Sequence, residues 1–343
     1  MTDQGKTIRW GIVGCGDVVE TKSGGAFHTI AHSTIHAIVR RDLEKARQSA
    51  IRFHADQWYD HIDDLLQDDQ VDAVYIATPP GLHYEQALAC CRANKPVYVE
   101  KPFTRNYTEA AELADRFEEA NLPLFVAHYR RALPRFIRIK HILDSGRIGE
   151  VCELDFRLSR RYSKDEAENG WLYNPRLSGG GVFVDIAPHA IDIMMYLTGD
   201  FTEVHGYATN NNPDYPVEDM VAMSFQTERK VIGTANFNLL SDEDADRMII
   251  YGTKGHVEFS VHGSDLVVIR DGSGTETLEI PTPKLIEEPM IETVVAALLG
   301  RGNCPCTGRD ALPTVKAMDT VLAAYYNGRD DDFWNRPESW GLS

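Results

Sequence analysis

A lysine that directly follows a predicted strand is the first residue whose setting could support chemistry. It lies in Val99-Glu100-Lys101-Pro102, where the proline restricts the backbone of the residue before it. An X-Pro bond can also be cis, which offers a way to aim the Lys101 amine into a cleft and toward a substrate oxygen. A surface turn with a solvated lysine would have the same sequence, so the pattern alone leaves both interpretations open.

A histidine and an aspartate one helical turn apart form the second candidate. They lie in the stretch from Gly179-Gly180-Gly181 to His189, where glycine-rich backbone leads into a helix with Pro188 in its first turn. On that helix Asp185, His189 and Asp192 lie together beside an apolar stripe. A carboxylate at i, i+4 can orient an imidazole and raise its pKa, as a proton shuttle requires. A helix-capping Asp185 beside an uninvolved His189 is the alternative.

Two glycines near the start of the chain are spaced as in a phosphate-binding loop. The apolar run at residues 8–13 predicts a buried parallel strand, and Gly14-Cys15-Gly16 follows it. Gly14 can take the tight turn, Gly16 lets backbone amides approach an anion, and the positive end of the following helix favours a pyrophosphate. The third fingerprint position is Val19, so an ordinary strand-to-helix turn is the alternative. The expected cofactor contacts in this loop are Gly14, Gly16, Asp17 and Val18.

Two arginines, Arg40 and Arg41, stand at the end of the second predicted strand, residues 36–40. An aspartate or glutamate at this point would bind the ribose hydroxyls of NAD, whereas arginine can accommodate the 2′-phosphate of NADP. Arg40 and Arg41 therefore predict NADP as the cofactor, with NAD as a possibility. Two solvated arginines that open a helix are the alternative.

The elements that must position these residues alternate between strand and helix in the first part of the chain. Further strands are predicted at residues 73–77, 97–99 and 124–127, with helices at residues 42–54, 62–67, 84–93 and 108–120. The alternation implies a doubly wound parallel sheet of the α/β Rossmann type, in which ligands bind at the carboxyl ends of the strands. Cofactor contacts are therefore also expected at Thr78, Pro79, His83, Glu100 and Lys101, which follow these strands.

The later part of the chain changes to strands with one polar face. Apolar and polar residues alternate at residues 152–159, and similar runs follow at residues 221–227, 231–239, 248–252, 256–261, 265–270 and 276–280. Their short connections predict a mostly antiparallel sheet, and helices return at residues 290–299 and 311–326. We therefore expect an NAD(P)-binding Rossmann domain at residues 1–127 and an α+β domain at residues 128–343 that binds substrate.

Composition restricts the class of partner. With 343 residues, 43% hydrophobic and 25% charged, the chain can form two globular domains. The net charge of −17 argues against a nucleic-acid or anionic-membrane surface. The start of the sequence has no signal-peptide pattern, which predicts a cytoplasmic protein. Cys304-Pro-Cys306 has no companion pair, so no metal site is expected.

Together, the loop at Gly14, the Glu-Lys-Pro at Glu100 and the glycine-rich stretch ending at His189 resemble the Gfo/Idh/MocA oxidoreductase family over nearly the whole chain. The resemblance implies a Rossmann domain, a nicotinamide cofactor, and a second domain whose open-faced sheet forms a homodimer or homotetramer. It also implies that Lys101, Asp185 and His189 are the catalytic set. His83 matches a family position near the nicotinamide, and a structural role at the start of a helix is its alternative.

The sequence departs from the family pattern at two places. Pro80 stands where relatives commonly carry asparagine, and His128-Tyr129-Arg130 stands where Phe-Asn-Arg is frequent, so cofactor and substrate contacts can differ there. The arginines could select an acidic sugar and Trp171 could stack on a sugar ring, although ordinary packing would also explain them. The candidate substrate contacts are Arg130, Arg160, Arg161, Tyr162, Trp171, Asn174 and His189.

The function predicted from these residues is hydride transfer between NADP and a hydroxyl or ketone of a sugar, sugar acid, polyol or cyclic diol. Lys101 would polarise the substrate oxygen, and His189, oriented by Asp185, would act as general acid or base. Two alternatives stay open: a glycosidase that oxidises its substrate transiently on bound NAD, and a sensor that binds the dinucleotide without turnover.

Overall fold

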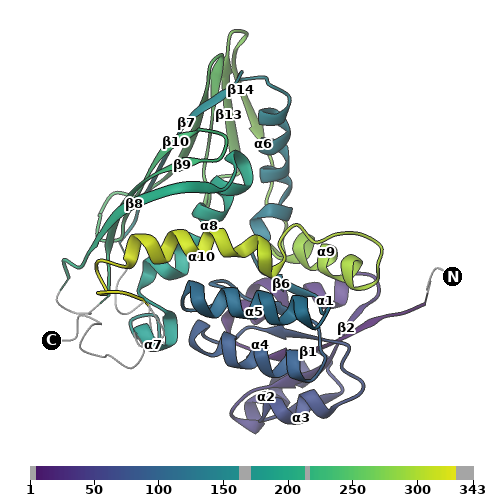
Figure 1. Cartoon of the computed structure of the whole chain (residues 1–343). Coiled ribbons are helices and arrows are strands. Elements are labelled where there is room, and N and C mark those ends of the chain that lie inside the picture. The colour runs from purple at the N-terminus through teal and green to yellow at the C-terminus, as the bar shows by residue number, and fades with distance from the viewer. Residues whose placement is uncertain (1–4, 162–170, 213–216, 330–343) are drawn as a thin grey trace. The chain divides into compact units, whose positions relative to one another are not determined.

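The computed structural model of the chain describes residues 5–161, 171–212 and 217–329 (Figure 1). The chain forms two compact units, each discontinuous in sequence. The first contains Met1–Thr104, Glu109–Leu133 and Pro283–Leu312, and the second contains Arg105–Thr108, Pro134–Thr282 and Pro313–Ser343. The predicted division after residue 127 lies close to the end of Glu109–Leu133, but that prediction does not include the return of Pro283–Leu312 to the first unit.

Six parallel strands form the sheet of the first unit, in the order β3-β2-β1-β4-β5-β6. They are β1 (Ile8–Val13), β2 (Ser33–Val39), β3 (Gln57–Tyr59), β4 (Ala73–Ile76), β5 (Val97–Val99) and β6 (Leu124–Val126). The chain runs outward from β1 through β2 to β3 and then crosses to β4 on the other side of β1. The predicted Rossmann sheet is confirmed, and ligands bind such sheets where the strand order reverses.

The helices of this unit connect successive strands, except for the last of them. They are α1 (Ala26–Thr29), α2 (Leu43–Arg52), α3 (Ile62–Gln67), α4 (His83–Arg92), α5 (Tyr107–Glu119) and, from the returning segment, α9 (Glu288–Leu298). The connection after β1 holds only a five-residue π-helix, η1 (Val19–Ser23), and the four residues of α1. Gly24 separates them, where an added Cβ would lie 2.6 Å from the Phe53 ring. The phosphate loop is therefore not followed by the long helix of the usual fingerprint.

A column of four aromatic side chains fills the core of the first unit. The ring centroids of Trp10 and Phe27 are 5.1 Å apart, those of Phe27 and Tyr75 are 5.2 Å apart, and those of Tyr75 and Tyr98 are 5.1 Å apart. All four side chains are fully buried. Each tyrosine brings a hydroxyl into the interior, where a polar group needs a hydrogen-bond partner.

Eight strands form the sheet of the second unit, in the order β14-β13-β12-β11-β7-β10-β9-β8. They are β7 (Val151–Ser159), β8 (Phe201–Thr209), β9 (Met220–Thr227), β10 (Ile232–Asn238), β11 (Ala245–Gly252), β12 (Gly255–Phe259), β13 (Leu266–Asp271) and β14 (Gly274–Glu279). All neighbours are antiparallel except β7 and β10 (Figure 1). The predicted mostly antiparallel sheet is confirmed.

Two helices cover one face of this sheet. Phe136 of α6 (Pro134–Asp144) contacts Phe259, and Phe183 of α8 (Val182–Thr198) packs at a right angle on Phe237, with ring centroids 5.0 Å apart. Phe259 and Phe237 are inward residues of the same sheet face, since the strand register places both on the side of Phe156. The two other helices that reach this unit are α7 (Pro175–Ser178) and α10 (Gly308–Leu322).

The α8 helix is apolar along almost its whole length. Within the described residues, Pro175–Thr198 is the one helical stretch whose length and composition would allow it to cross a membrane. Of its most apolar 18 residues, 89% are buried inside the protein, as expected for a core helix. The helix begins at Val182, so Pro188 lies inside it and not in its first turn as predicted.

Candidate active site

The Gly14 loop closes against the strand beside it. Gly14 has a φ of +83° and donates its amide to Val39, 3.0 Å away. An added Cβ at Gly14 would lie 2.7 Å from Cγ2 of Thr78 and 2.8 Å from the carbonyl oxygen of Ala77, so only glycine fits. An added Cβ at Gly16 would meet nothing within 4 Å. The backbone there is open to an approaching group, as a dinucleotide phosphate requires.

Thr78 and Pro79 follow β4, which lies next to β1 in the sheet. The Thr78 hydroxyl donates to Oε1 of Gln86 at 2.6 Å, which fixes the threonine against α4. Pro80 is buried and is the first residue of a short 3-10 helix, η2 (Pro80–Leu82). A backbone N–H at that position has no acceptor within the helix, so proline loses no hydrogen bond there. These residues and the Gly14 loop lie at the carboxyl ends of adjacent strands, where the strand order reverses.

His83 ties two of these loops together. Its Nε2 lies 2.7 Å from the carbonyl oxygen of Thr78, and its Nδ1 lies 3.0 Å from that of Pro102. The side chain is fully buried, and burial lowers the pKa of His83 against the raising effect of these carbonyl oxygens. The structure thus gives His83 a structural role between the loops after β4 and β5, and its contact with a cofactor stays a prediction.

Lys101 follows β5 at the same edge of the sheet. The Lys101–Pro102 peptide bond is cis. The neighbouring Glu100 is 4% exposed, and one of its oxygens lies 3.2 Å from the Lys101 backbone amide, which donates to it. The hydroxyl of Tyr75 donates to the other oxygen at 2.6 Å. A buried carboxylate therefore adjoins the expected catalytic lysine, and the sequence does not reveal its tyrosine partner.

The two arginines after β2 differ in setting. Arg40 is half-buried, and its Nη1 donates to Oγ of Ser49 on α2 at 2.9 Å. Arg41 is exposed. The carboxylate of Asp42 accepts the Lys45 backbone N–H at 3.0 Å and so caps α2. Arg41 is therefore the arginine whose guanidinium is more available to a 2′-phosphate.

In the second unit, the three glycines precede α8. Gly179 ends α7 with a φ of +85°, and the Gly181 amide donates to Oε1 of Glu218 at 2.8 Å. The Tyr326 hydroxyl donates to the other carboxyl oxygen of Glu218. Burial raises the pKa of Glu218, against the lowering effect of these two donors. Glu218 thus holds the first turn of the helix that carries the expected proton shuttle.

Asp185 and His189 lie one turn apart on α8, as the sequence predicts. His189 is 6% exposed, and the ring of His262 meets it edge to face with centroids 5.8 Å apart. Asp246 holds the His262 loop because its carboxylate accepts the backbone amides of Val261, His262 and Gly263. The second histidine has no helical spacing to His189 in the sequence, so only the fold reveals it.

The predicted substrate contacts of the second unit come from several segments of the chain, and their role stays a prediction. Arg160 and Arg161 pair with Asp244 and Asp242 at 3.8 and 2.7 Å. Asn174 caps α7 by accepting the Arg176 amide at 3.1 Å, and Trp171 is half-buried. Tyr162 lies outside the described residues. In the first unit, Arg130 is buried and its guanidinium lies 4.9 Å from the centroid of the Tyr129 ring.

The cysteines give no indication of a metal. Cys304 and Cys306 are buried, and burial raises the pKa of the Cys304 thiol to about 11, which disfavours the thiolate that metals bind. Among residues 5–161, 171–212 and 217–329, no group of three or more histidine, cysteine, aspartate or glutamate side chains is placed to hold a metal ion.

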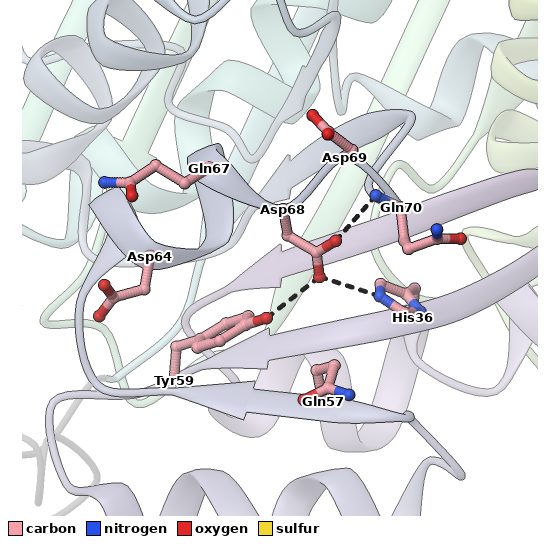
Figure 2. A pocket seen from close by; sticks show the side chains of 8 residues that line it. All are labelled: His36, Gln57, Tyr59, Asp64, Gln67, Asp68, Asp69 and Gln70. Atoms are coloured by element: carbon pink, nitrogen blue, oxygen red, sulfur yellow. Dashed lines mark hydrogen bonds and ion pairs between the residues drawn. The ribbon is translucent and has the colours of Figure 1, made fainter.

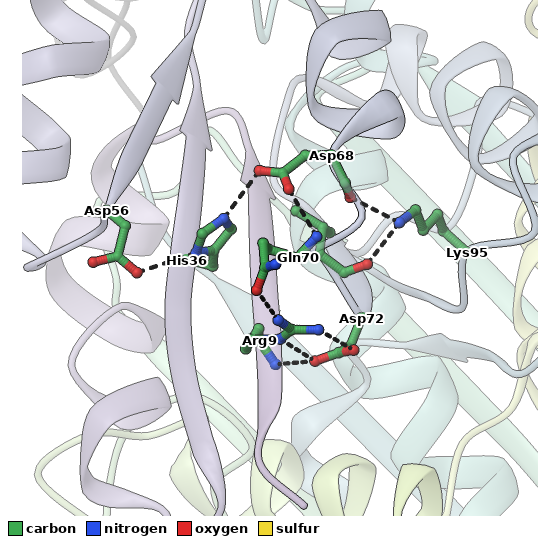
Figure 3. A network of polar contacts seen from close by, with 8 residues as sticks. Arg9, His36, Asp56, Asp68, Gln70, Asp72 and Lys95 are labelled. Atoms are coloured by element: carbon green, nitrogen blue, oxygen red, sulfur yellow. Dashed lines mark hydrogen bonds and ion pairs between the residues drawn. The ribbon is translucent and has the colours of Figure 1, made fainter.

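A pocket of about 440 Å³ lies elsewhere in the first unit (Figure 2). It is lined by His36, Gln57, Tyr59, Asp64 and residues 67–70, none of them a predicted site residue. Asp68 accepts from His36 Nε2 at 2.9 Å and from the Tyr59 hydroxyl at 3.1 Å. Figure 3 shows how the same contacts continue to Arg9, Asp72 and Lys95, tying β1 and β2 to the segment before β4. We interpret this region as structural.

Asp68→Asn should lower the free energy of unfolding by about 1–3 kcal/mol at pH 7, because an amide cannot accept all three hydrogen bonds of the carboxylate. Burial alone would raise the pKa of Asp68, but the donors Gln70, His36 and Tyr59 outweigh it and lower the pKa. The carboxylate therefore stabilises the fold above its unfolded pKa of about 3.9, and this contribution is lost as pH falls through the lower folded value.

Urea denaturation followed by tryptophan fluorescence at pH 7 and below pH 4 measures this difference. Asp69→Asn is the matched control, since Asp69 is exposed beside the same pocket and should change stability by less than about 0.5 kcal/mol. Equal stability of Asp68→Asn and Asp69→Asn at pH 7 would contradict the assignment.

Comparison with known proteins matches both halves of the chain to one family. Residues 8–128 match the oxidoreductase family with an NAD-binding Rossmann fold, and residues 136–258 match the GFO/IDH/MocA C-terminal domain. Oxidoreductase P35 of Formosa agariphila is 36% identical over 315 residues, which are 91% of this chain and 97% of that protein. The chain belongs to the Gfo/Idh/MocA oxidoreductase family.

Two further comparisons show how Gfo/Idh/MocA proteins resemble this chain. The levoglucosan dehydrogenase of Pseudarthrobacter phenanthrenivorans is 27% identical over 275 residues, 74% of this chain and 70% of that protein. A solved structure of a levoglucosan dehydrogenase with NADH and levoglucosan has a TM-score of 0.84 at 21% identity, covering 93% of this chain and 97% of that one. Family membership confirms the predicted fold and the predicted class of NAD(P)-dependent oxidoreductase.

Proposed function

We propose that this chain is an NADP-dependent oxidoreductase acting on a hydroxyl or ketone of a sugar, sugar acid, polyol or cyclic diol. One observation carries the proposal: the open backbone at Gly16 and the Lys101 motif lie at the same edge of one parallel sheet, after β1 and β5. The levoglucosan dehydrogenase among its relatives supports a carbohydrate-like substrate.

The first unit fits a dinucleotide. The Gly14 turn that a Cβ would block, together with the open backbone at Gly16, is the arrangement that accepts a pyrophosphate. The residues that would hold the dinucleotide are Gly14, Gly16, Asp17, Val18, Arg40, Arg41, Thr78, Pro79, His83, Glu100 and Lys101. When bound, the nicotinamide supplies or accepts the hydride.

The side chains of the protein handle the substrate oxygen and its proton. In the reductive direction, the Lys101 ammonium donates a hydrogen bond to the carbonyl oxygen and stabilises the negative charge that develops there. His189 supplies the proton that turns the alkoxide into a hydroxyl, and Asp185 orients its ring. In the oxidative direction the same groups act in reverse, with His189 as the base.

The cofactor preference is tested by fluorescence titration with NADPH and NADH. We expect NADPH to bind about tenfold more tightly or better, which corresponds to about 1.4 kcal/mol. Arg41→Ala should weaken NADPH binding about tenfold and leave NADH binding unchanged, because only NADPH carries the phosphate that Arg41 pairs with. Arg47→Ala on α2, the helix that follows Arg41, is the matched control, since Arg47 pairs with Glu44.

Tenfold tighter binding of NADH by the unchanged protein would overturn the NADP assignment. It would leave the hydride-transfer assignment standing, since Lys101 and the Gly14 loop do not depend on the 2′-phosphate.

The substrate is found by following nicotinamide absorbance with a panel of sugars, sugar acids, polyols and cyclic diols. Net oxidation or reduction of the nicotinamide supports the proposal. Release of a sugar from a glycoside without a net absorbance change would show the transient-oxidation glycosidase instead. Tight dinucleotide binding without turnover of any member would favour the sensor.

We further propose that the exposed face of the second unit's sheet forms a homodimer or homotetramer. Tyr207 on β8 is 81% exposed and Ile232 on β10 is 62% exposed, although both lie in a sheet whose other face is a packed core. Light scattering of the purified protein tests this, and a monomer at all concentrations would contradict it.

A further inference from the structure

A buried acid from the returning segment lies under the Lys101 motif. Glu287 immediately precedes α9, and its side chain is fully buried in the first unit. It lies among Tyr75 on β4, Tyr98 on β5, and Glu100 and Lys101 after β5. No step of the proposed mechanism uses Glu287, and burying a carboxylate is unfavourable unless its charge is compensated.

Hydrogen bonds connect this cluster to the phosphate loop. The Tyr75 hydroxyl lies 2.6 Å from Oε1 of Glu100, 3.1 Å from Oγ of Ser23 and 3.5 Å from Oε2 of Glu287. The Ser23 hydroxyl also lies 3.4 Å from the carbonyl oxygen of Val18, so its proton can bond either that oxygen or the Tyr75 hydroxyl. The chain of contacts therefore runs from Val18, an expected cofactor contact, to the backbone amide of Lys101.

The geometry distinguishes the two carboxyl groups. Glu100 accepts two donors, the Tyr75 hydroxyl and the Lys101 amide, so both of its oxygens act as acceptors. The single Tyr75 proton is directed to Glu100, so at 3.5 Å Glu287 receives no comparable donor. Within the described part of the chain, no donor is directed at its Oε1. A buried carboxylate would leave that oxygen with an uncompensated charge, whereas a protonated acid would not.

Electrostatics points the same way. Burial, then the charge of Glu100 and a side-chain hydrogen bond with it, raise the pKa of Glu287 well above its ordinary range, against the opposing charges of Lys22 and Lys101. Two adjacent carboxyls that are shielded from water cannot both ionise easily, so they share one proton. The tyrosines cannot supply a further charge, because burial raises the pKa values of Tyr75 and Tyr98 well above 10.

We propose that Glu287 is a neutral positioning residue for Lys101: it donates its proton in a hydrogen bond to the Glu100 carboxylate. The pair then carries one negative charge, which acts on the Lys101 ammonium. The carboxylate stays where the lysine needs it because Glu287, Tyr75 and the Lys101 amide all donate to it. This inference rests on the role proposed above for Lys101.

Four forms of the enzyme test the proposal: the unchanged protein, Glu287→Gln, Glu287→Leu and Glu100→Gln. The first readout requires no turnover. Competitive acetylation of Lys101 with acetic anhydride over a range of pH, followed by mass spectrometry, reports the pKa of its ammonium. The second readout is kcat, measured with the dissociation constant of NADPH.

Glutamine keeps an N–H donor for Glu100 and carries no charge. The pKa of Lys101 in Glu287→Gln should therefore equal its pKa in the unchanged protein. Glu287→Leu leaves Glu100 without this donor and should lower both the pKa of Lys101 and kcat, the latter about tenfold. Glu287→Gln should recover most of that turnover. Glu100→Gln removes the charge itself and should lower the pKa of Lys101 most.

An ionised Glu287 would give a different result, because Glu287→Gln would then lower the pKa of Lys101 as much as Glu100→Gln does. That outcome overturns the proposal, as does a Glu287→Leu variant with the Lys101 titration unchanged. Thermal unfolding followed by circular dichroism confirms that each variant is folded. If the unchanged protein turns over no substrate, the proposed function fails, while the acetylation data still decide the state of Glu287.

Discussion

Lys101→Met should lower kcat by about 10²- to 10³-fold while leaving the dissociation constant of NADPH nearly unchanged. Methionine has a similar length but no N–H, so the developing alkoxide loses its donor, and removing one such donor typically has an effect of this size. The dinucleotide keeps its main contacts with the backbone of the Gly14 loop, which the substitution does not touch. Steady-state kinetics and NADPH fluorescence titration on the same preparations measure the two quantities.

Lys45→Met is the matched control for this variant, since Lys45 is an exposed lysine on α2 of the same unit. It should retain the turnover of the unchanged protein. Equal turnover in Lys101→Met would refute the role of Lys101. A loss of NADPH binding equal to the loss of kcat would instead make cofactor binding the main role of Lys101.

His189→Gln should lower kcat by about 10²- to 10⁴-fold, the usual range for removing a general acid or base. Glutamine has donor and acceptor atoms but cannot exchange a proton near neutral pH. The remaining activity should therefore lose the dependence on pH that the imidazole contributes. A pH profile of kcat for the unchanged protein and the variant measures this change.

His141→Gln provides the control in the second unit, because His141 is exposed on α6. It should leave both kcat and its pH profile unaltered. If His189→Gln kept the pH profile of the unchanged protein, another group would be the general acid. His262, whose ring contacts His189, would then be the next residue to replace.

The sequence was sufficient for the arrangement of strands and helices wherever a repeating pattern extends over several residues. The alternating helices and strands of the first part predict the parallel sheet, and the Gly14 turn follows from its two glycines. β3 was not predicted because its three residues are too few to show a period. β8 was not predicted because its burial alternates only weakly between half-exposed and exposed positions.

The candidate site was predictable only where its residues lie close in sequence. Asp185 and His189 are one helical turn apart, and Glu100 and Lys101 are neighbours, so their proximity is local. Tyr75 and Glu287 are separated by 212 residues and meet only through the fold. The sequence offers one signal for this pairing, a tyrosine within an apolar strand at Tyr75. A tyrosine hydroxyl that is buried with such a strand needs a hydrogen-bond partner.

The path of the chain through the first unit has a consequence for biosynthesis. Domains generally fold as units during synthesis, beginning with the earlier part of the chain. Here the first unit includes Pro283–Leu312, so its sheet can form long before Glu287 has been made. Until then Glu100 would lie in the nascent protein without its proton donor. Most of the chain must therefore be synthesised before the first unit can complete its folding.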